Sequence, residues 1–452
     1  MHLSRSALLA PIPGRTDALL VQPLSGQVAL VGESEARALR GLASGGALPA
    51  TVDAAALREA RFVVDSEDED RALHAEAWAT FLEEVEKTPT QLVFVPTFGC
   101  NLRCTYCYQE VFDPAGRGLV SPEVLDAFFA YLDARHGSDS PRPYLTLFGG
   151  EPLVDTPAHH DRLGRILDGA RAARIRVAAV TNGYDLEAFA DDLHAGPVKE
   201  VQVTLDGPQA VHDARRPHAS GRGTFADAVR GVEALVAREI PVNLRVVVDR
   251  DNLEHLPALA RLALEKGWLD LPEFRFKTQI GRNYELFGCA SQQRRDALLD
   301  RVELWARYAE LAEAHPELRR FHLPRFHGIR HLAETDELPV PNFDACPAAK
   351  KEWAFAPDGG LYGCTATVGN PRYRLGSFWP EIRIDEAAVE PWRTRSVATI
   401  ERCKTCDAAA VCGGGCGALA DAQGLGIHGP DCRPVKELFG IGARFYRLGE
   451  PS

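Results

Sequence analysis

The sequence predicts an α/β protein whose main domain is a parallel sheet built from six βα units. Between about residues 90 and 315, apolar runs of strand length alternate with helix-like segments, one of which begins with Ser121 as N-cap and Pro122 at its first helical position. Such alternation implies a parallel sheet, because parallel strands need long crossovers. Six units are too few for a closed eight-stranded barrel. The strand-like runs lie at 92–96, 144–148, 176–181, 199–205, 242–249 and 273–277.

The N-terminal part of the chain forms a separate small α+β module in this interpretation. Strand-like runs at 17–21 and 27–31 flank a turn that contains Pro and Gly, which is typical of a hairpin. We expect a short helix from Glu35 to Leu42 with Ser34 as its N-cap, followed by a Gly-rich break. An acidic stretch from Glu67 to Glu86 has a helical pattern.

Composition and charge exclude several classes of protein. The chain has 452 residues, enough for two or three domains, and a formal net charge of −12. This charge argues against a general nucleic-acid surface, which needs clustered Lys and Arg. We find no membrane-spanning apolar run and no signal-peptide pattern, so we expect a cytoplasmic protein. Without a secretory signal, the eleven cysteines indicate metal ligation rather than disulfides.

Three cysteines lie close together just after the first strand-like run of the main domain. Cys100, Cys104 and Cys107 have C-x3-C-x2-C spacing. Three thiolates on one loop can hold an iron–sulfur cluster, but they leave one iron of a cubane uncovered. A substrate or cofactor can then bind directly to that iron. A small zinc site is the alternative, although zinc motifs usually add a second C-x2-C pair.

Further motifs follow the next strands of the predicted sheet. Phe148-Gly-Gly-Glu-Pro152 comes after the second run, where two glycines allow a close backbone approach and Glu151 offers a carboxylate. Thr204-Leu-Asp-Gly-Pro208 and then His212-Asp-Ala-Arg-Arg216 come after the fourth. In a parallel barrel these positions share the carboxyl edge of the strands, where ligand sites gather.

Together, the cysteine spacing, Tyr106 and these motifs resemble the radical S-adenosylmethionine (SAM) superfamily. The resemblance implies an open, partial (β/α)6 barrel. It also implies that SAM binds at the open iron, with its amino group on the glycine–glutamate motif. The ribose and carboxylate of SAM would contact residues after the fourth strand. The candidate SAM contacts are Gly149, Gly150, Glu151, Thr204, Asp206 and Arg216.

The C-terminal region contains seven more cysteines in a long, ordered arrangement. Cys346 and Cys364 precede a C-x2-C-x5-C-x3-C run, and a final cysteine follows it. The pattern resembles the SPASM domain, which carries two auxiliary four-iron four-sulfur clusters; a pair of zinc sites is the rival interpretation. By resemblance the first cluster takes Cys346, Cys364 and Cys416. The second takes Cys403, Cys406, Cys412 and Cys432.

The first auxiliary set lacks a fourth cysteine, although some members of the family have an extra one between the positions of Cys346 and Cys364. The first auxiliary cluster therefore has an open iron or is completed by Cys289. Buried cysteines more often fill apolar space than bind metal, and Cys289 is not included among the ligands. In the N-terminal module, the strands and helices resemble the peptide-binding winged-helix modules of the PqqD family. A simple cap over the next domain is the alternative.

The sequence therefore predicts three domains: the winged-helix-like module at 1–88, the radical SAM partial barrel at 89–315, and a linker with the SPASM domain at 316–452. The resemblance implies SAM and three [4Fe-4S] clusters as cofactors, and an electron donor such as flavodoxin or ferredoxin. It implies a maturase that uses a 5′-deoxyadenosyl radical to abstract hydrogen from a ribosomally made peptide, a leader-bearing precursor. The product would contain a thioether, C–C or C–O cross-link. An anaerobic sulfatase-maturing enzyme that forms formylglycine is the second hypothesis. A non-enzymatic electron-transfer or peptide-binding protein is the third.

Overall fold

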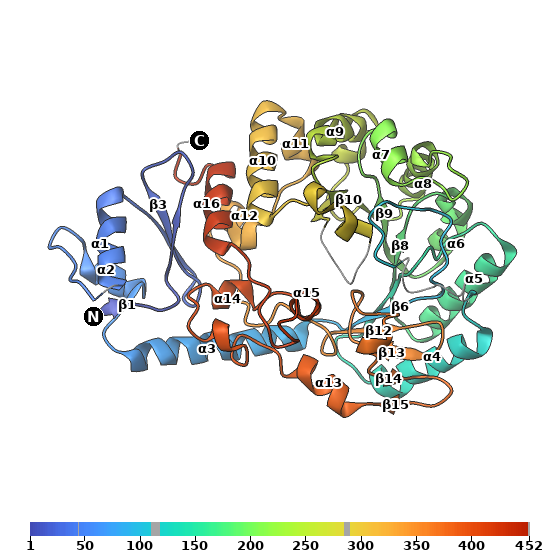
Figure 1. Cartoon of the computed structure of the whole chain (residues 1–452), viewed down its shortest axis with the longest axis horizontal. Coiled ribbons are helices and arrows are strands. Elements are labelled where there is room, and N and C mark those ends of the chain that lie inside the picture. The colour runs from blue at the N-terminus through green and yellow to red at the C-terminus, as the bar shows by residue number, and fades with distance from the viewer. Residues whose placement is uncertain (44, 110–117, 284–289, 451–452) are drawn as a thin grey trace.

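The computed structural model describes residues 1–43, 45–109, 118–283 and 290–450. Figure 1 shows the N-terminal module in blue at one end of the molecule and the barrel at the other. The C-terminal segments, in orange and red, lie between and beneath these two parts. No helix among the described residues is both long enough and apolar enough to cross a bilayer.

Six parallel strands form the barrel sheet, and they follow one another in sequence order across it. The predicted α/β class is confirmed. Side chains alternate along each strand: Val242, Leu244 and Val246 lie in the main apolar core, which leaves Asn243 and Arg245 on the opposite, inner face. The strands are β6 (Gln91–Phe94), β7 (Tyr144–Leu147), β8 (Val177–Thr181), β9 (Val198–Thr204), β10 (Val242–Val248) and β11 (Phe276–Arg282).

Helices connect these strands. The predicted start of the first is confirmed, because the Ser121 side chain accepts a hydrogen bond from the Val124 amide and Pro122 opens the helix. Several of these helices present buried apolar side chains to the core. The helices are α4 (Pro122–His136), α5 (Pro157–Ala172), α6 (Ala190–Ala195), α7 (Gln209–Arg215), α8 (Phe225–Ala237) and α9 (Leu256–Glu265).

The last barrel strand begins later than the sequence pattern predicts. The prediction of 273–277 was wrong in its bounds, since β11 runs from Phe276 to Arg282. The Arg275 and Phe276 amides both donate to the Pro272 carbonyl. The chain therefore makes a turn through residues 273–275 before it joins the sheet.

The C-terminal region extends the barrel sheet, which the sequence did not predict. Strand β12 (Glu352–Phe355) pairs in parallel with β6, with Glu352 opposite Gln91. Three short antiparallel strands follow outward, so the sheet counts ten strands within the described ranges. They are β13 (Gly360–Tyr362), β14 (Gly376–Ser377) and β15 (Arg383–Ile384).

The N-terminal module contains more strands than predicted. The expected hairpin is present as β3 (Ala18–Gln22) and β4 (Gln27–Val31), but β2 (Leu8–Pro11) pairs with the other side of β3. Strand β3 is therefore central, and β4 is an edge of this sheet in the described chain. A second, two-stranded pairing joins β1 (His2–Leu3) to β5 (Val63–Val64). The four-residue β2 ends in Pro11, which weakens its strand pattern.

The helices of the module also differ from the prediction at one position. Helix α1 spans Glu33–Ala43, so Ser34 lies inside the helix and is not its N-cap. The Gly32 amide donates to the Glu35 carboxylate instead. The acidic stretch is helical as expected, as α3 (Glu67–Lys87) with Ser66 as N-cap, and a short α2 (Ala54–Glu59) precedes it.

Two contacts tie the N-terminal module to the C-terminal region. Phe343 is fully buried, and its ring packs against Trp78 and Phe81 of α3 at centroid distances of 5.2 and 5.6 Å. At the other end, α16 (Val435–Phe445) packs against β2 and β3. The remaining α-helices are α10 (Arg301–Ala314), α11 (Glu317–Phe321), α12 (Ile329–Thr335), α13 (Glu386–Arg393), α14 (Ala409–Cys412) and α15 (Gly417–Ala422).

Candidate active site

The loop of Cys100, Cys104 and Cys107 follows β6 and is fixed by backbone hydrogen bonds to a distant segment. The Arg103 amide donates to the Pro217 carbonyl at 2.8 Å, and the Thr105 amide donates to the Arg215 carbonyl at 2.9 Å. The loop thus lies against the segment that follows β9. This arrangement brings the cysteines to the carboxyl edge of the sheet.

The glycines after β7 pack against this cysteine loop. The Gly150 amide donates to the Thr97 carbonyl at 3.0 Å, and the Glu151 amide donates to the Gly99 carbonyl at 2.8 Å. A Cβ atom at Gly150 would lie 2.1 Å from the Gly99 oxygen, and Gly149 has a φ of 128°. The sequence predicts that these glycines allow a close backbone approach. In the structure they lie close to the backbone of the cysteine loop.

Glu151 is buried and accepts three hydrogen bonds. Its Oε1 accepts from the Leu153 amide at 3.0 Å and from the Thr181 hydroxyl at 2.7 Å, while Oε2 accepts from the Asn182 amide at 2.6 Å. Burial nevertheless raises the pKa of Glu151 to about 7. Its charge also acts on Cys100, whose pKa rises to about 12, mainly through burial. Glu151 thus joins the ends of β7 and β8 beside the cysteine loop.

Asn182 was not predicted by the sequence reasoning, although it lies in a Thr-Asn-Gly turn after β8. Its side-chain amide donates to the side-chain Oδ1 of Asn101 at 2.8 Å and lies 3.8 Å from the Cys100 sulfur. Asn101 in turn donates to Asp185 at 2.9 Å. The signal available in the sequence was the polar turn at a strand's carboxyl end.

Tyr106, Asp206 and Arg216 form one buried hydrogen-bonded group. Arg216 donates to the Tyr106 hydroxyl at 2.5 Å, and that hydroxyl donates to Asp206 Oδ2 at 2.6 Å. Asp206 is fully buried, and its other oxygen accepts from the Val247 amide at 3.0 Å. Arg215 donates to Asp206 Oδ2 at 3.4 Å and to Asp249 at 2.6 Å. Both Asp206 oxygens are therefore engaged by the protein itself.

The residues around the loop fit an iron–sulfur cluster in their donor chemistry. The three thiols interact electrostatically with one another. Burial raises the pKa of Cys104 to about 11, and the nearby Arg216 charge opposes this rise. The Nε atom of Arg216 is buried and has no hydrogen-bond partner among the described residues. A cluster of thiolates would supply the negative charge that this guanidinium faces. No three His, Cys, Asp or Glu side chains in the described chain are arranged to hold a single metal ion.

The structure brings the first C-terminal set together. Cys346 and Cys416 both raise the pKa of Cys364, whose largest cause of elevation is burial. Glu352 of β12 lies close enough to act on the same thiol, and its own pKa is raised by burial. This buried carboxylate was missed from the sequence, because nothing local marks it. Cys289, the other candidate for this set, lies outside the described residues.

The structure also brings the cysteines of the second C-terminal set close together. Cys406, Cys412 and Cys432 all contribute to the raised pKa of Cys403, after burial. The ten described cysteines are all free thiols.

A run of left-handed glycines separates the two C-terminal sets. Gly413, Gly414 and Gly415 have φ values of 61°, 74° and 69°, a conformation that other residues rarely adopt. A Cβ at Gly415 would lie 2.1 Å from the Asp431 carbonyl oxygen. The buried Arg395 donates to the Gly414 and Gly415 carbonyls at 2.6 and 3.0 Å. This turn carries the chain from Cys412, in the second set, to Cys416, in the first set.

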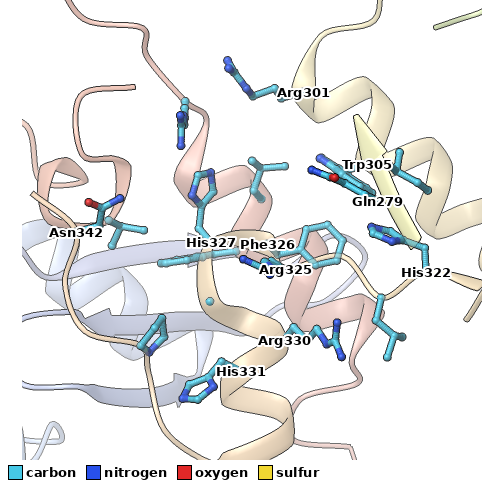
Figure 2. Close-up of a pocket in the computed structure, with 18 of the residues that line it drawn as sticks. Gln279, Arg301, Trp305, His322, Arg325, Phe326, His327, Arg330, His331 and Asn342 are labelled. Carbon is cyan, nitrogen blue, oxygen red and sulfur yellow. The ribbon is translucent and has the colours of Figure 1, made fainter. Parts of the chain in front are cut away.

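A cavity of about 1190 Å³ opens between the barrel, the C-terminal region and the N-terminal module. Its wall includes residues of β9, β10 and β11, α10, the segment 322–331, and Val21 and Pro23 of the module. Figure 2 shows side chains that line it. None of the described cysteines belongs to this wall. Arg245 does, and it lies opposite Thr204 in the sheet register. The cavity is thus next to the end of β9.

A strained turn carries His327 into this wall. Phe326 and His327 have φ values of 41° and 54°, which costs roughly 1–3 kcal/mol for each non-glycine residue. The Phe326 ring lies 5.7 Å from both Trp305 and Phe445, centroid to centroid, and this packing holds the turn. Strain of this kind persists where the surrounding structure fixes it, and it is concentrated at functional sites.

Comparisons with known proteins agree with this architecture. Residues 94–263 match the sequence model of the Radical SAM superfamily. Mycofactocin maturase MftC of Mycobacterium ulcerans is 28% identical over 360 residues, which cover 76% of this chain and 87% of that protein. The cysteine-type anaerobic sulfatase-maturating enzyme of Clostridium perfringens is 24% identical, over 74% of this chain and 90% of the enzyme. Some other curated relatives are matched over 53% of their own length.

Two solved structures share the fold. The structure of anSMEcpe with bound AdoMet has a TM-score of 0.59 at 19% identity and covers 80% of this chain and 95% of its own. Streptococcus suis SuiB bound to S-adenosylmethionine has a TM-score of 0.52 at 13% identity and covers 96% of this chain and 99% of its own. SuiB has also been solved with its precursor peptide SuiA, at a TM-score of 0.50 and 13% identity.

Proposed function

Because this chain carries a radical SAM domain, we propose that it is a maturase that installs a cross-link in a ribosomally made precursor peptide. The observation that carries the proposal is the cavity of about 1190 Å³ between the barrel, the C-terminal region and the N-terminal module. Small-molecule sites commonly occupy about 300–1,000 Å³. A cavity beyond that range, walled by all three parts of the chain, suits a peptide that contacts each of them.

The family implies SAM and a [4Fe-4S] cluster, and we assign Cys100, Cys104 and Cys107 to that cluster. When bound, these groups supply one-electron cleavage of SAM to a 5′-deoxyadenosyl radical, which takes a hydrogen atom from the substrate. Glu151 would hold the SAM ammonium group with a charge-assisted hydrogen bond. Arg216, with its unpartnered Nε, would face the negative charge of the cluster or of the SAM carboxylate.

Asp206 has a different role in this proposal from the direct SAM contact suggested by the sequence. Its charge is already paired, because it accepts from Arg215 as well as from Tyr106, whereas Glu151 accepts only from two backbone amides and a hydroxyl. It would orient Tyr106 and Arg215, and through Tyr106 it would fix Arg216. Thr204, at the end of β9, would contact the ligand directly; it lies opposite Arg245 of the cavity wall in the sheet register.

The C-terminal cysteines would hold two auxiliary clusters, in the sets that the structure gathers: Cys346, Cys364 and Cys416, and Cys403, Cys406, Cys412 and Cys432. An external donor such as flavodoxin or ferredoxin would supply the electron for SAM cleavage. The second function, sulfatase maturation, is favoured by the similarity to the Clostridium perfringens enzyme. SuiB covers 96% of this chain, whereas anSMEcpe covers 80%. The larger coverage by SuiB supports the peptide maturase, because SuiB leaves less of this chain without a structural counterpart than anSMEcpe does.

The test is a reaction of the anaerobically reconstituted enzyme with SAM, a reductant and candidate precursor peptides from short open reading frames neighbouring its gene. We expect 5′-deoxyadenosine and a peptide that has lost two hydrogen atoms, seen by mass spectrometry. The variant with Cys100, Cys104 and Cys107 changed to Ala should lose SAM cleavage but keep roughly two thirds of its iron, since one of three cubanes is removed. A sulfatase peptide converted to formylglycine while the neighbouring peptide stays unchanged would favour the second function. Stoichiometric zinc in place of iron would contradict both.

A further inference from the structure

The wall of the cavity is basic, although the chain as a whole is acidic. Among the residues that the structure describes, seven Lys and Arg line it against three Glu, whereas the chain has a formal net charge of −12. Figure 2 shows Arg301, Arg325 and Arg330 around this space. The basic residues are Arg245, Lys277, Arg282, Arg301, Arg325, Arg330 and Arg433.

The three glutamates of the wall are already paired. Glu200 lies 2.5 Å from the Lys277 ammonium group. Arg330 binds the other two, at 2.9 Å to Glu273 and 2.7 Å to Glu334. The three acidic side chains of the described wall therefore pair with only two of its seven cations, Lys277 and Arg330.

Arg245 and Arg325 form no ion pair within 4 Å in the part of the chain that the structure describes, although the Arg325 charge helps to lower the pKa of Glu273, after the larger effect of Arg330. Arg245 projects from the inner face of β10, opposite Thr204 on one side and Gln279 on the other. Its guanidinium lies over Gly281 of β11, where a Cβ atom would come within 2.5 Å of it. Arg325 is exposed and immediately precedes the strained turn at Phe326. One guanidinium thus lies in the interior of the barrel and the other precedes the turn that carries His327.

A further group of cations lies near His327. Burial lowers the pKa of His327 to about 4, and the charges of Arg433 and Arg301 lower it further. Arg301 has a carboxylate partner, Asp431, at 3.3 Å. Arg433 also acts on the thiol of Cys412. Its charge lowers the pKa of Cys412, against the larger effect of burial, and its Nε is buried without a hydrogen-bond partner among the described residues.

We propose that this cavity selects a peptide segment that carries Asp or Glu side chains, with carboxylates on Arg245 and Arg325. The inference rests on the proposed function, because it specifies the composition of the peptide that the enzyme modifies. A planar guanidinium binds a carboxylate through two parallel hydrogen bonds, which makes the contact strong and directional. An acidic segment would neutralise the two unpaired guanidinium groups, whereas a basic one would be repelled.

The test compares two labelled synthetic peptides that differ only in charge. Both are nine-residue Gly-rich peptides with a fluorescein label, one with three Glu and one with three Gln at the same positions. Binding to the reconstituted holoenzyme with SAM is followed anaerobically by fluorescence anisotropy. We expect the Glu peptide to bind at least about tenfold more tightly. The advantage should shrink as salt is raised. Equal affinity for the two peptides would overturn the inference, and this measurement needs no variant.

Matched variants locate the effect. Arg245→Gln with Arg325→Gln should reduce the preference for Glu to less than about threefold. The control is Arg37→Gln with Arg71→Gln, which removes the same charge from exposed helix positions, 75% and 60% accessible, in the N-terminal module. The control should keep the full preference. If both pairs lower it equally, the inference fails, because net charge and not the cavity is then responsible. SAM cleavage by the wild-type enzyme is measured separately, so failure of the proposed function is distinguishable.

Discussion

The hydroxyl of Tyr106 donates a 2.6 Å hydrogen bond to Asp206, and this contact joins the cysteine loop to the carboxyl end of β9. Arg216 donates to the same hydroxyl. The Tyr106 side chain, on the loop between two cysteines, therefore contacts both a carboxylate and a guanidinium that follow β9. The position of the cysteine loop therefore depends on Asp206 and Arg216, which the cysteine spacing alone does not reveal.

Changing Tyr106 to Phe should destabilise the protein by about 1–3 kcal/mol, because Asp206 loses a donor and Arg216 loses an acceptor in a buried site. The affinity for SAM should fall as well, since Arg216 is no longer fixed. Urea unfolding and equilibrium dialysis with SAM measure the two effects. The control is Tyr131→Phe, a buried tyrosine whose hydroxyl has no hydrogen-bond partner among the described residues. Equal effects of the two changes would contradict the assigned role.

Glu151 should make the cluster-free protein less stable as the pH rises. Its folded pKa of about 7 lies above the ordinary value of 4.5, so the folded state holds the proton more tightly than the unfolded chain does. The contribution of Glu151 to the free energy of unfolding is fully present below pH 4.5 and is lost as the pH rises to about 7. The loss is on the order of 3 kcal/mol.

The measurement is the free energy of unfolding of the cluster-free protein across this range, for wild type and Glu151→Gln. The variant should lack this part of the pH dependence because its side chain does not titrate. Glu67→Gln, at a position that is 85% exposed, serves as the control and should keep it. A Glu151→Gln variant with the wild-type pH dependence would show that other groups cause it.

Most parts of the fold that depend on local patterns were predictable from the sequence, although the Ser34 cap was not. The six strand-like runs and the Ser121 cap are encoded by residues next to one another, and only the last strand was misplaced, by the turn after Pro272. The pairing of β12 with β6 was not predictable. Its four residues carry no local sign of a partner that lies far away in the sequence.

The candidate site divides in the same way. Cysteine spacing placed three sets of thiols, and the structure brings the members of each set together. The partners of these groups could not be predicted, because they come from other elements. Asn182, Glu352 and Arg395 approach the cysteine sets or the turn between them only after the chain has folded.

Gly415→Ala should impair the first auxiliary set more than a change in backbone preference alone would. The new Cβ would meet the Asp431 carbonyl oxygen at 2.1 Å, at a φ of 69°. Gly424→Ala is the matched control, with a φ of 80° and no atom within 4 Å. The control should cost about 1–2 kcal/mol from backbone strain. We expect Gly415→Ala to cost more and also to lower the iron content after reconstitution. Equal stability and iron in the two variants would show that the turn tolerates a side chain.

Phe343→Ala should separate α3 from the C-terminal region. The side chain is fully buried against Trp78 and Phe81, so its removal should cost about 3–5 kcal/mol. Phe274→Ala provides the control, because this side chain is 77% exposed and its loss should change stability by less than about 0.5 kcal/mol. Thermal or urea unfolding distinguishes the two. A small effect at Phe343 would mean that the module is held mainly by α16.

The parallel pairing of β6 with β12 affects how this protein can be recombined with its relatives. Strand β6 leads into the loop of Cys100, and β12 leads through one short hairpin to Cys364. The Tyr108 hydroxyl, one residue after Cys107, donates to the Thr365 carbonyl at 3.1 Å. Two cysteine sets are thereby fixed on one sheet, one after β6 and the other after β13, with β12 between these strands. A foreign C-terminal region fused at residue 316 would have to supply a strand that matches the edge of β6. We therefore expect a C-terminal region to be exchanged successfully only together with the barrel strand that it pairs with.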